Sequence, residues 1–255
     1  MLPDPKTLLV SREEHVAHVR FNTPDSGNLV TEAVLDELIA VLTAVRDDPA
    51  VRVVTLSGAG PDFSLGGDRE ESVGLMEEDP GGAAVGRLVA KARQACDALA
   101  AGGAVSIARL HGRVVGAGLA LALFCDLRAG AEGSTFRMPE LALGVPLAWG
   151  GALPRLVQEA GAARVRELLL FGGSFDAARA QELAILHRVV PEEELDGVIA
   201  GWVRPLVRRS PTALRVTRTL LNAHLASSRL ADATLLDGPL MASVLAMGQR
   251  PARGR

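Results

Sequence analysis

Three glycine-containing segments have residue types that suit the stabilisation of a developing negative charge. They are Asp62–Asp68, His111–Leu119 and Phe136–Gly151, and we expect each to lie at a turn between a strand and a helix. Glycine at such a turn exposes backbone N–H groups, and a helix that follows adds the positive end of its dipole. Two turns of this kind side by side form an oxyanion hole, which we expect of the first two segments.

The third segment adds a single carboxylate, Glu140, directly after Pro139 and among apolar residues. Burial in apolar surroundings raises the pKa of a carboxyl group and suits it to proton transfer near neutral pH. The predicted chemistry is therefore acid–base catalysis beside a stabilised oxyanion. The same segments are also compatible with three ordinary turns, and the residue types leave both interpretations open.

Other common constellations are incomplete in this chain. Gly116–Gly118 begins like a dinucleotide-binding loop, but the third glycine position is Leu121, and no phosphate-binding loop of the Walker type is found. Ser174 follows a glycine, yet the glycine that closes a nucleophile elbow is missing. His15 and His18 lie on a predicted strand, where they would face opposite sides, which argues against a metal site.

Hydrophobic periodicity predicts the elements that position these segments. We expect strands at 17–21, 51–56, 104–110, near 127–130 and at 187–190, and helices at 31–46, 85–99 and 116–125. Alternation of this kind implies an α/β fold of right-handed units with mainly parallel strands. After Pro191 the strand pattern stops, and residues 193–247 predict three helices divided at 210–211 and around 227–231. These helices have little partner surface of their own, so we expect them to pack on another subunit.

Composition and charge exclude several classes of function. The chain has 255 residues, a net charge of −3, 48% hydrophobic and 3% aromatic residues, and no tyrosine. These values exclude a disordered chain and a generic nucleic-acid binder, and they argue against base-stacking surfaces. The charge is uneven: residues 201–255 carry +7, from nine arginines and two aspartates, which leaves −10 for residues 1–200. A phosphorylated ligand or an acidic subunit surface would suit the basic region, and so would solvated helix faces.

The chain shows no signal for export or membrane insertion. Its start lacks a basic segment followed by an apolar stretch, and its longest uncharged run, Leu141–Pro154, has 14 residues where a span needs ~20. Cys96 and Cys125 have no metal-ligand spacing and are expected to be buried free thiols. We therefore expect a soluble cytoplasmic protein that holds no metal.

Taken together and in order, these segments resemble the crotonase superfamily, the enoyl-CoA hydratase/isomerase family. The residues that carry the resemblance are Pro24–Leu29, Phe63–Asp68, Gly116–Gly118, Cys125-Asp126, Phe136–Gly144 and Leu183–Pro191. The resemblance implies a ClpP/crotonase-like ββα-superhelix core over residues 1–191 and a C-terminal helical oligomerisation region over 192–255. It further implies homotrimers or dimers of trimers, an acyl-CoA thioester substrate, and no cofactor other than the coenzyme A of the substrate. From the charge balance and the short apolar runs we expect no nucleic-acid or membrane partner.

The resemblance also assigns roles to individual residues. It places the backbone N–H groups of Gly67 and Ala117 in the oxyanion hole and makes Glu140 the acid/base. The expected substrate-binding residues are Leu65, Gly66, Asp68, Arg69, Gly116 and Trp149. Among these, Asp68 is expected to cap a helix, and Trp149 to line the acyl pocket or to be a core residue. His111 is expected to be structural.

Two departures from the family pattern bear on the reaction. Hydratases of the family carry a second glutamate three residues after the oxyanion-hole residue, and here that position is Ala120. A methyl group cannot orient or deprotonate water, so the resemblance favours an isomerase in which Glu140 removes a proton and returns it at another carbon. The lysines that usually contact coenzyme A are also replaced, one by Asp25 or Ser26 and the other by Glu70. This leaves Arg69 and the C-terminal arginines as candidates for phosphate contacts.

Two alternatives remain open. The first is a hydratase, dehydratase or decarboxylase that acts on an acyl-CoA or acyl-carrier-protein thioester with Glu140 alone or with a loop carboxylate. Glu70 and Glu71 are expected to face solvent, but either would reach the site if the loop up to about Pro80 folds inward. The second alternative is a catalytically silent binding subunit of the crotonase fold.

Overall fold

The main sheet of the protein has six strands in the order β1-β2-β3-β4-β6-β9. In the computed structural model, which describes residues 3–227 and 236–248, they are β1 (Leu8–Glu13), β2 (Val16–Phe21), β3 (Val53–Gly58), β4 (Val105–Leu110), β6 (Leu127–Ala131) and β9 (Arg188–Val190). Only β1 and β2 pair antiparallel, and every other neighbouring pair in this sheet is parallel. The five predicted strands are present, and the α/β fold with mainly parallel pairing is confirmed.

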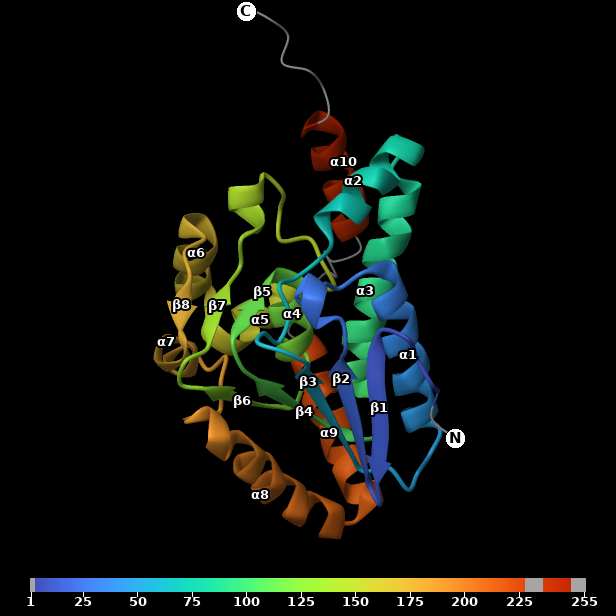
Figure 1. Ribbon diagram of the computed structural model, residues 1–255, viewed down its shortest axis with the longest axis vertical. Coiled ribbons are helices and arrows are strands. Elements are labelled where there is room, and N and C mark those ends of the chain that lie inside the picture. Colours follow the sequence, from blue (N-terminus) through green and yellow to red (C-terminus); the bar gives the residue numbers. More distant parts are fainter. Residues whose placement is uncertain (1–2, 228–235, 249–255) are drawn as a thin grey trace, which may run out of the picture.

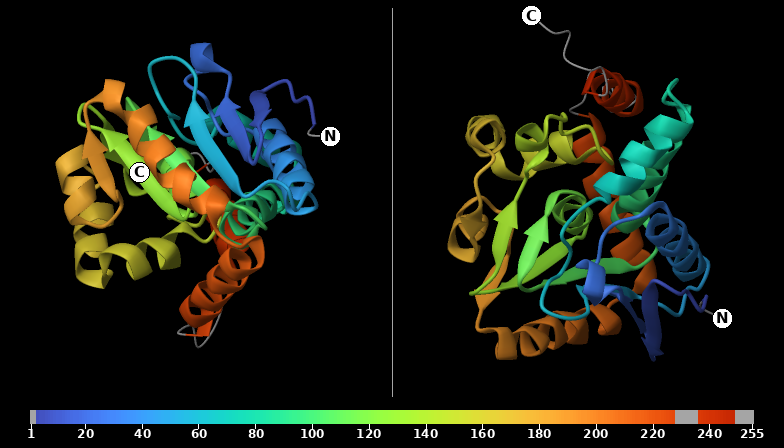
Figure 2. Two further views of the ribbon diagram at one scale, coloured as in Figure 1. Left: turned by 90° about the horizontal axis from the view of Figure 1, so that it is seen from below. Right: turned by 45° about the horizontal axis from the view of Figure 1, so that its top comes forward.

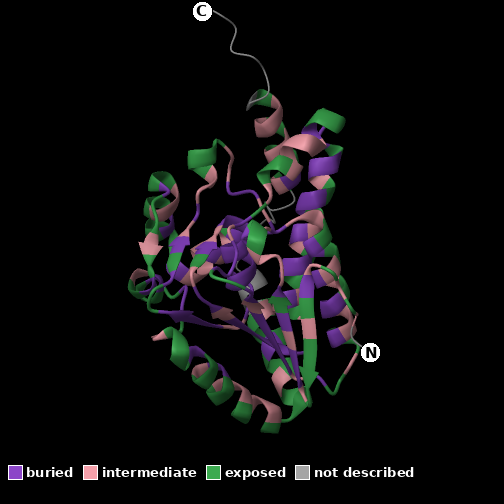
Figure 3. Ribbon diagram, in the orientation of Figure 1, coloured by how far each residue is buried: buried purple, intermediate pink, exposed green. Residues whose placement is uncertain are grey.

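Helices cover both faces of this sheet (Figure 1). Alternate strand residues point to opposite faces, so Val54 packs with α1 (Glu32–Arg46) and α3 (Ala83–Ala101), whereas its neighbour Val53 packs with α8 (Leu195–Arg208). The buried residues form layers between the sheet and these helices (Figure 3). The main core thus lies on the α1/α3 side of the sheet.

A second, smaller sheet consists of β5 (Arg113–Val115), β7 (Thr135–Arg137) and β8 (Phe175–Asp176). The sequence pattern does not predict these strands, because two or three residues are too few to show a period. β5 continues directly into α4 (Gly116–Leu123), whose residues are all buried in the main core. The predicted helix at 116–125 is therefore present, and the second sheet fixes its start.

Shorter helices connect these layers. They are η1 (Pro24–Ser26), α2 (Arg69–Glu78), η2 (Glu140–Leu143), α5 (Ala152–Ala160), α6 (Ala162–Phe171), α7 (Ala177–Glu182) and η3 (Glu192–Glu194). Cys96 and Cys125 are buried free thiols, as expected, and burial raises the pKa of Cys125 to about 12. Within the ranges that the structure describes, no helix is long and apolar enough to cross a membrane.

Three helices follow β9: α8, α9 (Pro211–Ser227) and α10 (Asp237–Gly248). The predicted division at 210–211 is confirmed, whereas the division around 227–231 falls mostly outside the described residues. The expectation that these helices have little partner surface in their own chain is wrong, whereas their packing on another subunit stays a prediction. Leu195 and Ile199 of α8 are buried against the main sheet, α9 contacts α3, and α10 contacts α2 and α3. Figure 2 shows α9 extending beyond the rest of the molecule.

Candidate active site

Three chain segments run parallel to one another at the predicted site. Ser64 forms a parallel bridge with Val114, and Val114 pairs in parallel with Phe136 of β7. Because the carboxyl ends of parallel segments meet at the same edge, the residues that follow each segment are brought together.

The residues brought together in this way are those that the sequence singles out. Gly67, Ala117 and Glu140 follow their paired segments by three or four residues. A methyl group placed on Gly67 would lie 3.8 Å from Ala117 Cβ, and one on Gly116 would lie 3.3 Å from Glu140 Oε1. Both glycine turns and the single carboxylate therefore line one small region.

The first turn holds a backbone N–H group in an outward orientation. Gly66 has a φ of +102°, and its carbonyl accepts a hydrogen bond of 2.8 Å from Val30 N. Because a trans peptide directs its C=O and N–H to opposite sides, the N–H of Gly67 points away from Val30. Ala117 lies in the first turn of α4, where an N–H has no acceptor within the helix. In the described part of the chain, neither N–H donates to another residue, so both are available to an external oxygen.

Glu140 is a partly buried carboxyl with unused hydrogen-bonding capacity. It is the first residue of η2, and its Oε2 is buried without a hydrogen-bond partner among the described residues. Burial raises the pKa of Glu140 to about 7, opposed only by a hydrogen bond from its own backbone N–H. No neighbouring charge contributes to this shift. The group is therefore close to half-protonated at neutral pH, which suits a residue that takes up and returns a proton.

Residues around the first turn have mainly structural contacts. Leu65 packs over Gly27, where a methyl group would clash with the Leu65 side chain. The Asp68 carboxylate accepts a hydrogen bond of 3.1 Å from Glu71 N and caps α2, as the sequence predicts. Arg69 is exposed at the start of α2. A substrate-binding role for these residues remains a prediction.

Trp149, His111 and Ala120, which the sequence also singles out, are buried or half-buried. Trp149 is half-buried and packs against the main core. His111 is buried, with Nε2 2.9 Å from Gly60 O, in keeping with a structural role. Ala120, which occupies the position of the second glutamate, is 1% exposed within α4.

The two neighbouring acidic residues of α2 differ from each other. Glu70 is exposed, as expected. Glu71 is half-buried, and its two carboxylate oxygens accept hydrogen bonds of 3.0 and 3.1 Å from Glu32 N. Burial raises the pKa of Glu71, and the nearby Asp68 and Glu32 carboxylates add to this effect. The Glu71 carboxylate is therefore engaged with Glu32 N, one of the N–H groups at the start of α1 that have no acceptor within the helix.

The arginines of α8 and Arg218 of α9 do not lie at the predicted site. α8 packs on the face of the main sheet opposite to α4, so the arginines of α8 are separated from Ala117 by the sheet. Arg218 of α9 is buried and paired with Asp126. Of the predicted phosphate contacts, Arg69 lies two residues after Gly67 and is exposed, and its contact with a phosphate stays a prediction.

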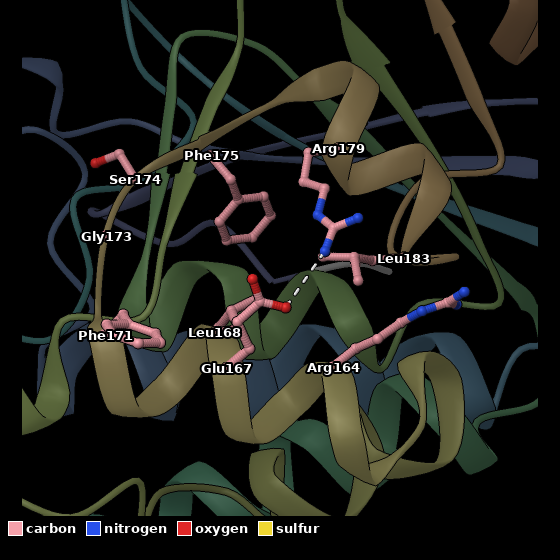
Figure 4. A pocket seen from close by; sticks show the side chains of 9 residues that line it. All are labelled: Arg164, Glu167, Leu168, Phe171, Gly173, Ser174, Phe175, Arg179 and Leu183. Atoms are coloured by element: carbon pink, nitrogen blue, oxygen red, sulfur yellow. Dashed lines mark ion pairs between the residues drawn. The ribbon is translucent and has the colours of Figure 1, made fainter.

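A surface cavity of about 230 Å³ lies elsewhere, between α6, β8 and α7 (Figure 4). Its lining residues are Arg164, Glu167, Leu168, Phe171, Gly173, Ser174, Phe175, Arg179 and Leu183. An ion pair of 3.6 Å joins Arg179 to Glu167 across it. Since none of the oxyanion or acid/base residues lines this cavity, it is separate from the predicted site.

No cluster of metal-ligating side chains was found in residues 3–227 and 236–248. The two histidines considered in the sequence have other partners. His15 Nδ1 lies 2.8 Å from Ala50 O, and His18 Nδ1 lies 2.8 Å from Thr55 Oγ1.

Comparison with known proteins identifies relatives of the whole chain. Residues 11–248 match the family model described as enoyl-CoA hydratase/isomerase. A probable enoyl-CoA hydratase of Mycobacterium bovis is 30% identical over 241 residues, which cover 94% of this chain and 90% of the relative. The 2,3-dehydroadipyl-CoA hydratase of Escherichia coli is 29% identical over 214 residues, which cover 84% of this chain and 81% of the relative.

The solved structures that superpose on this chain include proteins described as enoyl-CoA hydratases. A putative enoyl-CoA hydratase from Thermobifida fusca, in complex with acetoacetyl-CoA, superposes with a TM-score of 0.78 at 29% identity, covering 96% of each chain. An enoyl-CoA hydratase/carnithine racemase from Magnetospirillum magneticum superposes with a TM-score of 0.82 at 28% identity, covering 92% of this chain and 86% of that chain.

Proposed function

Because the chain belongs to the enoyl-CoA hydratase/isomerase family, we propose that it stabilises the enolate of an acyl-CoA thioester and uses Glu140 as its single acid/base. The Gly67 and Ala117 N–H groups bind the thioester oxygen. The observation that carries this proposal is the buried, unpartnered Oε2 of Glu140, in a carboxyl whose pKa is raised to about 7 beside Gly116.

The favoured reaction is isomerisation of a 3-enoyl thioester to a 2-enoyl thioester. The Glu140 carboxylate takes a proton from carbon 2, and the electron pair moves to the thioester oxygen as a dienolate forms. The two N–H groups hold that oxygen, and a single such donor contributes about 2.7–4 kcal/mol to lowering the barrier. Protonated Glu140 then returns the proton at carbon 4, so that atoms and electrons balance without a co-reactant.

The surroundings of Glu140 favour this reaction over hydration. Ala120 has no group that orients water, Asp68 caps α2, and the Glu71 carboxylate is bound to α1. The names of the relatives provide the contrary argument, since several are hydratases. Hydration with Glu140 alone is therefore the second candidate function.

Replacement of the carboxyl tests the assignment of Glu140. In the Glu140→Gln variant we expect turnover to fall by ~10² or more, because general acid–base catalysis contributes this much. Glu70→Gln is the matched control, since Glu70 is exposed, and it should keep the activity. Circular dichroism should show that both variants are folded. Full activity of Glu140→Gln would overturn the proposal.

The reaction type is settled by isotope labelling. Incubation of 3-hexenoyl-CoA in D₂O, followed by mass spectrometry, should give 2-hexenoyl-CoA, which carries deuterium where protonated Glu140 exchanges with D₂O before it returns the proton. Crotonyl-CoA in H₂¹⁸O should gain no oxygen. Incorporation of ¹⁸O would establish hydration and overturn isomerisation. Parallel reactions with acyl-pantetheine test a carrier-protein thioester, and release of CO₂ from a malonyl-type thioester would indicate a decarboxylase. If calorimetry shows no binding of any acyl-CoA, the silent-subunit alternative replaces the enzymatic one.

A further inference from the structure

The proposed oxyanion turn is held to the start of α1 from two sides. Before Gly67, the carbonyl of Gly66 accepts a hydrogen bond of 2.8 Å from Val30 N. After Gly67, the Glu71 carboxylate accepts hydrogen bonds of 3.0 and 3.1 Å from Glu32 N. The donors of both contacts are only two residues apart, so they clamp the turn against a single short segment.

The Glu71 carboxylate accepts from a backbone N–H at the start of α1 that has no acceptor within the helix. Thr31 caps α1 and accepts a hydrogen bond of 3.2 Å from Val34 N. The N–H of Glu32 has no acceptor within the helix, and the carboxylate of Glu71 supplies one from α2. A negative charge is favoured at this end of a helix by the helix dipole.

The connection from Glu71 back to Gly67 is also rigid. Asp68 follows Gly67 directly and caps α2 by accepting from Glu71 N at 3.1 Å. A displacement of Glu71 therefore moves the first turn of α2 and, with it, the peptide that carries the Gly67 N–H.

We propose that Glu71 is a positioning residue for the oxyanion hole: by binding Glu32 N, it fixes the orientation of the Gly67 N–H. This inference rests on the proposed function of Gly67 as a donor. Glu71 itself touches neither the substrate nor the reacting atoms.

Removal of the carboxylate should lower kcat with little change in KM. A misdirected donor weakens the contact that is strongest in the transition state, so we expect Glu71→Ala to lower kcat by roughly 10- to 100-fold. Glu71→Gln keeps an acceptor oxygen and should restore kcat to within roughly threefold of the original protein. The control is Glu70→Ala, one residue earlier in the same helix and exposed. A purely structural role predicts lower stability with unchanged kcat, which would overturn the proposal.

A second variant removes the donor in place of the acceptor. Glu32 is the first residue of α1, where proline is tolerated, and Thr31 has the extended conformation (φ −89°, ψ 171°) that a residue before proline prefers. Glu32→Pro should therefore lower kcat as much as Glu71→Ala does, and the double variant should be no worse than either. Glu32→Pro also removes the ion pair of 2.8 Å between Glu32 and Lys91. Glu32→Ala is the control for this loss, because it removes the same ion pair but keeps the N–H. Additive losses in the double variant would contradict the proposal.

The polarisation of the thioester gives a readout that does not depend on turnover. Butyryl-CoA labelled with ¹³C at the thioester carbonyl should show its C=O stretch shifted to lower frequency when bound. The shift should be smaller in Glu71→Ala and Glu32→Pro and be regained in Glu71→Gln. An unchanged shift in Glu71→Ala would overturn the positioning role alone, whereas no shift in the original protein would overturn the oxyanion hole itself.

Discussion

A single carboxyl group can perform both halves of a proton transfer when its two protonation states have similar free energies. The pKa of Glu140 meets this condition because burial raises it to about 7. A second nearby acid would shift this value by charge repulsion, and no other charged group contributes to it here. Burial without a neighbouring charge therefore leaves the Glu140 carboxyl in the state that a single acid/base needs.

The raised pKa has a consequence for stability that is separate from catalysis. Between the ordinary value of 4.5 and about 7, the folded protein binds a proton at Glu140 that the unfolded chain has released. The free energy of unfolding should therefore fall as the pH rises through this window, by at most about 3 kcal/mol. Urea denaturation at several pH values measures the slope, which should be smaller in Glu140→Gln. An equal slope in both proteins would show that Glu140 is not the group responsible.

At the level of elements, the sequence predicts the segments that form the site but not which of them pair with one another. The glycine turns at Gly66 and Gly116 are visible because their residue types are unusual between a strand and a helix. The pairing of Ser64 with Val114, which brings the turns together, has no local signal, because such short segments have no period. The hydrogen bond of Glu71 is not predicted for a related reason. Its donor, Glu32 N, is a backbone group that is free to donate only because α1 begins at Glu32.

The attachment of α9 to the core is a further contact that hydrophobic patterns do not reveal. Arg218 donates to the carbonyls of Leu99 and Ala100 at the end of α3, at 3.1 and 2.8 Å. It also pairs with Asp126, at 2.8 Å. A cation is favoured at the C-terminal end of a helix, and this one fastens α9 to both α3 and the segment after α4.

Removing the Arg218 guanidinium should therefore destabilise the protein strongly. Arg218→Met removes the cation that pairs with Asp126 and donates to the α3 carbonyls. Ser106 still donates to Asp126, and Asn222 still donates to Ala100 O, so we expect a loss of about 2–3 kcal/mol in the free energy of unfolding. Guanidinium denaturation measures this loss. Arg215→Met, at an exposed position one turn earlier, is the control and should change stability by less than about 0.5 kcal/mol. Equal stability of the two variants would show that α9 is not held by this contact.

At the level of the whole molecule, the charge asymmetry of the sequence has a structural explanation only in part. Arg218 is used inside the chain, and α8 carries its arginines on the face of the sheet away from Ala117. The described arginines of the basic C-terminal region therefore do not form a single phosphate-binding surface, and Arg229, Arg250, Arg253 and Arg255 lie outside the described residues. Contact with an acidic subunit surface remains the prediction that suits the exposed arginines of α8 and α9.

The apolar surface of the chain favours such a contact. Leu220 and Leu221 of α9 are 65% and 60% exposed, and Leu170 and Phe171 of α6 are 71% and 85% exposed. Large exposed apolar side chains that gather on neighbouring positions are typical of protein interfaces, so we propose that the chain forms the homotrimer or hexamer that the family resemblance implies.

Light scattering after gel filtration measures the assembly directly. The original protein should elute with the mass of three or six chains, and Leu220→Glu/Leu221→Glu should shift it to the mass of one, because two buried charges would oppose the interface. Thr219→Glu places one charge at the adjacent exposed position of α9 and should keep the assembly if the two leucines form the contact. The mass of a single chain for the original protein at every concentration would contradict the oligomer. An intact assembly in the double variant would move the interface away from α9, towards Leu170 and Phe171.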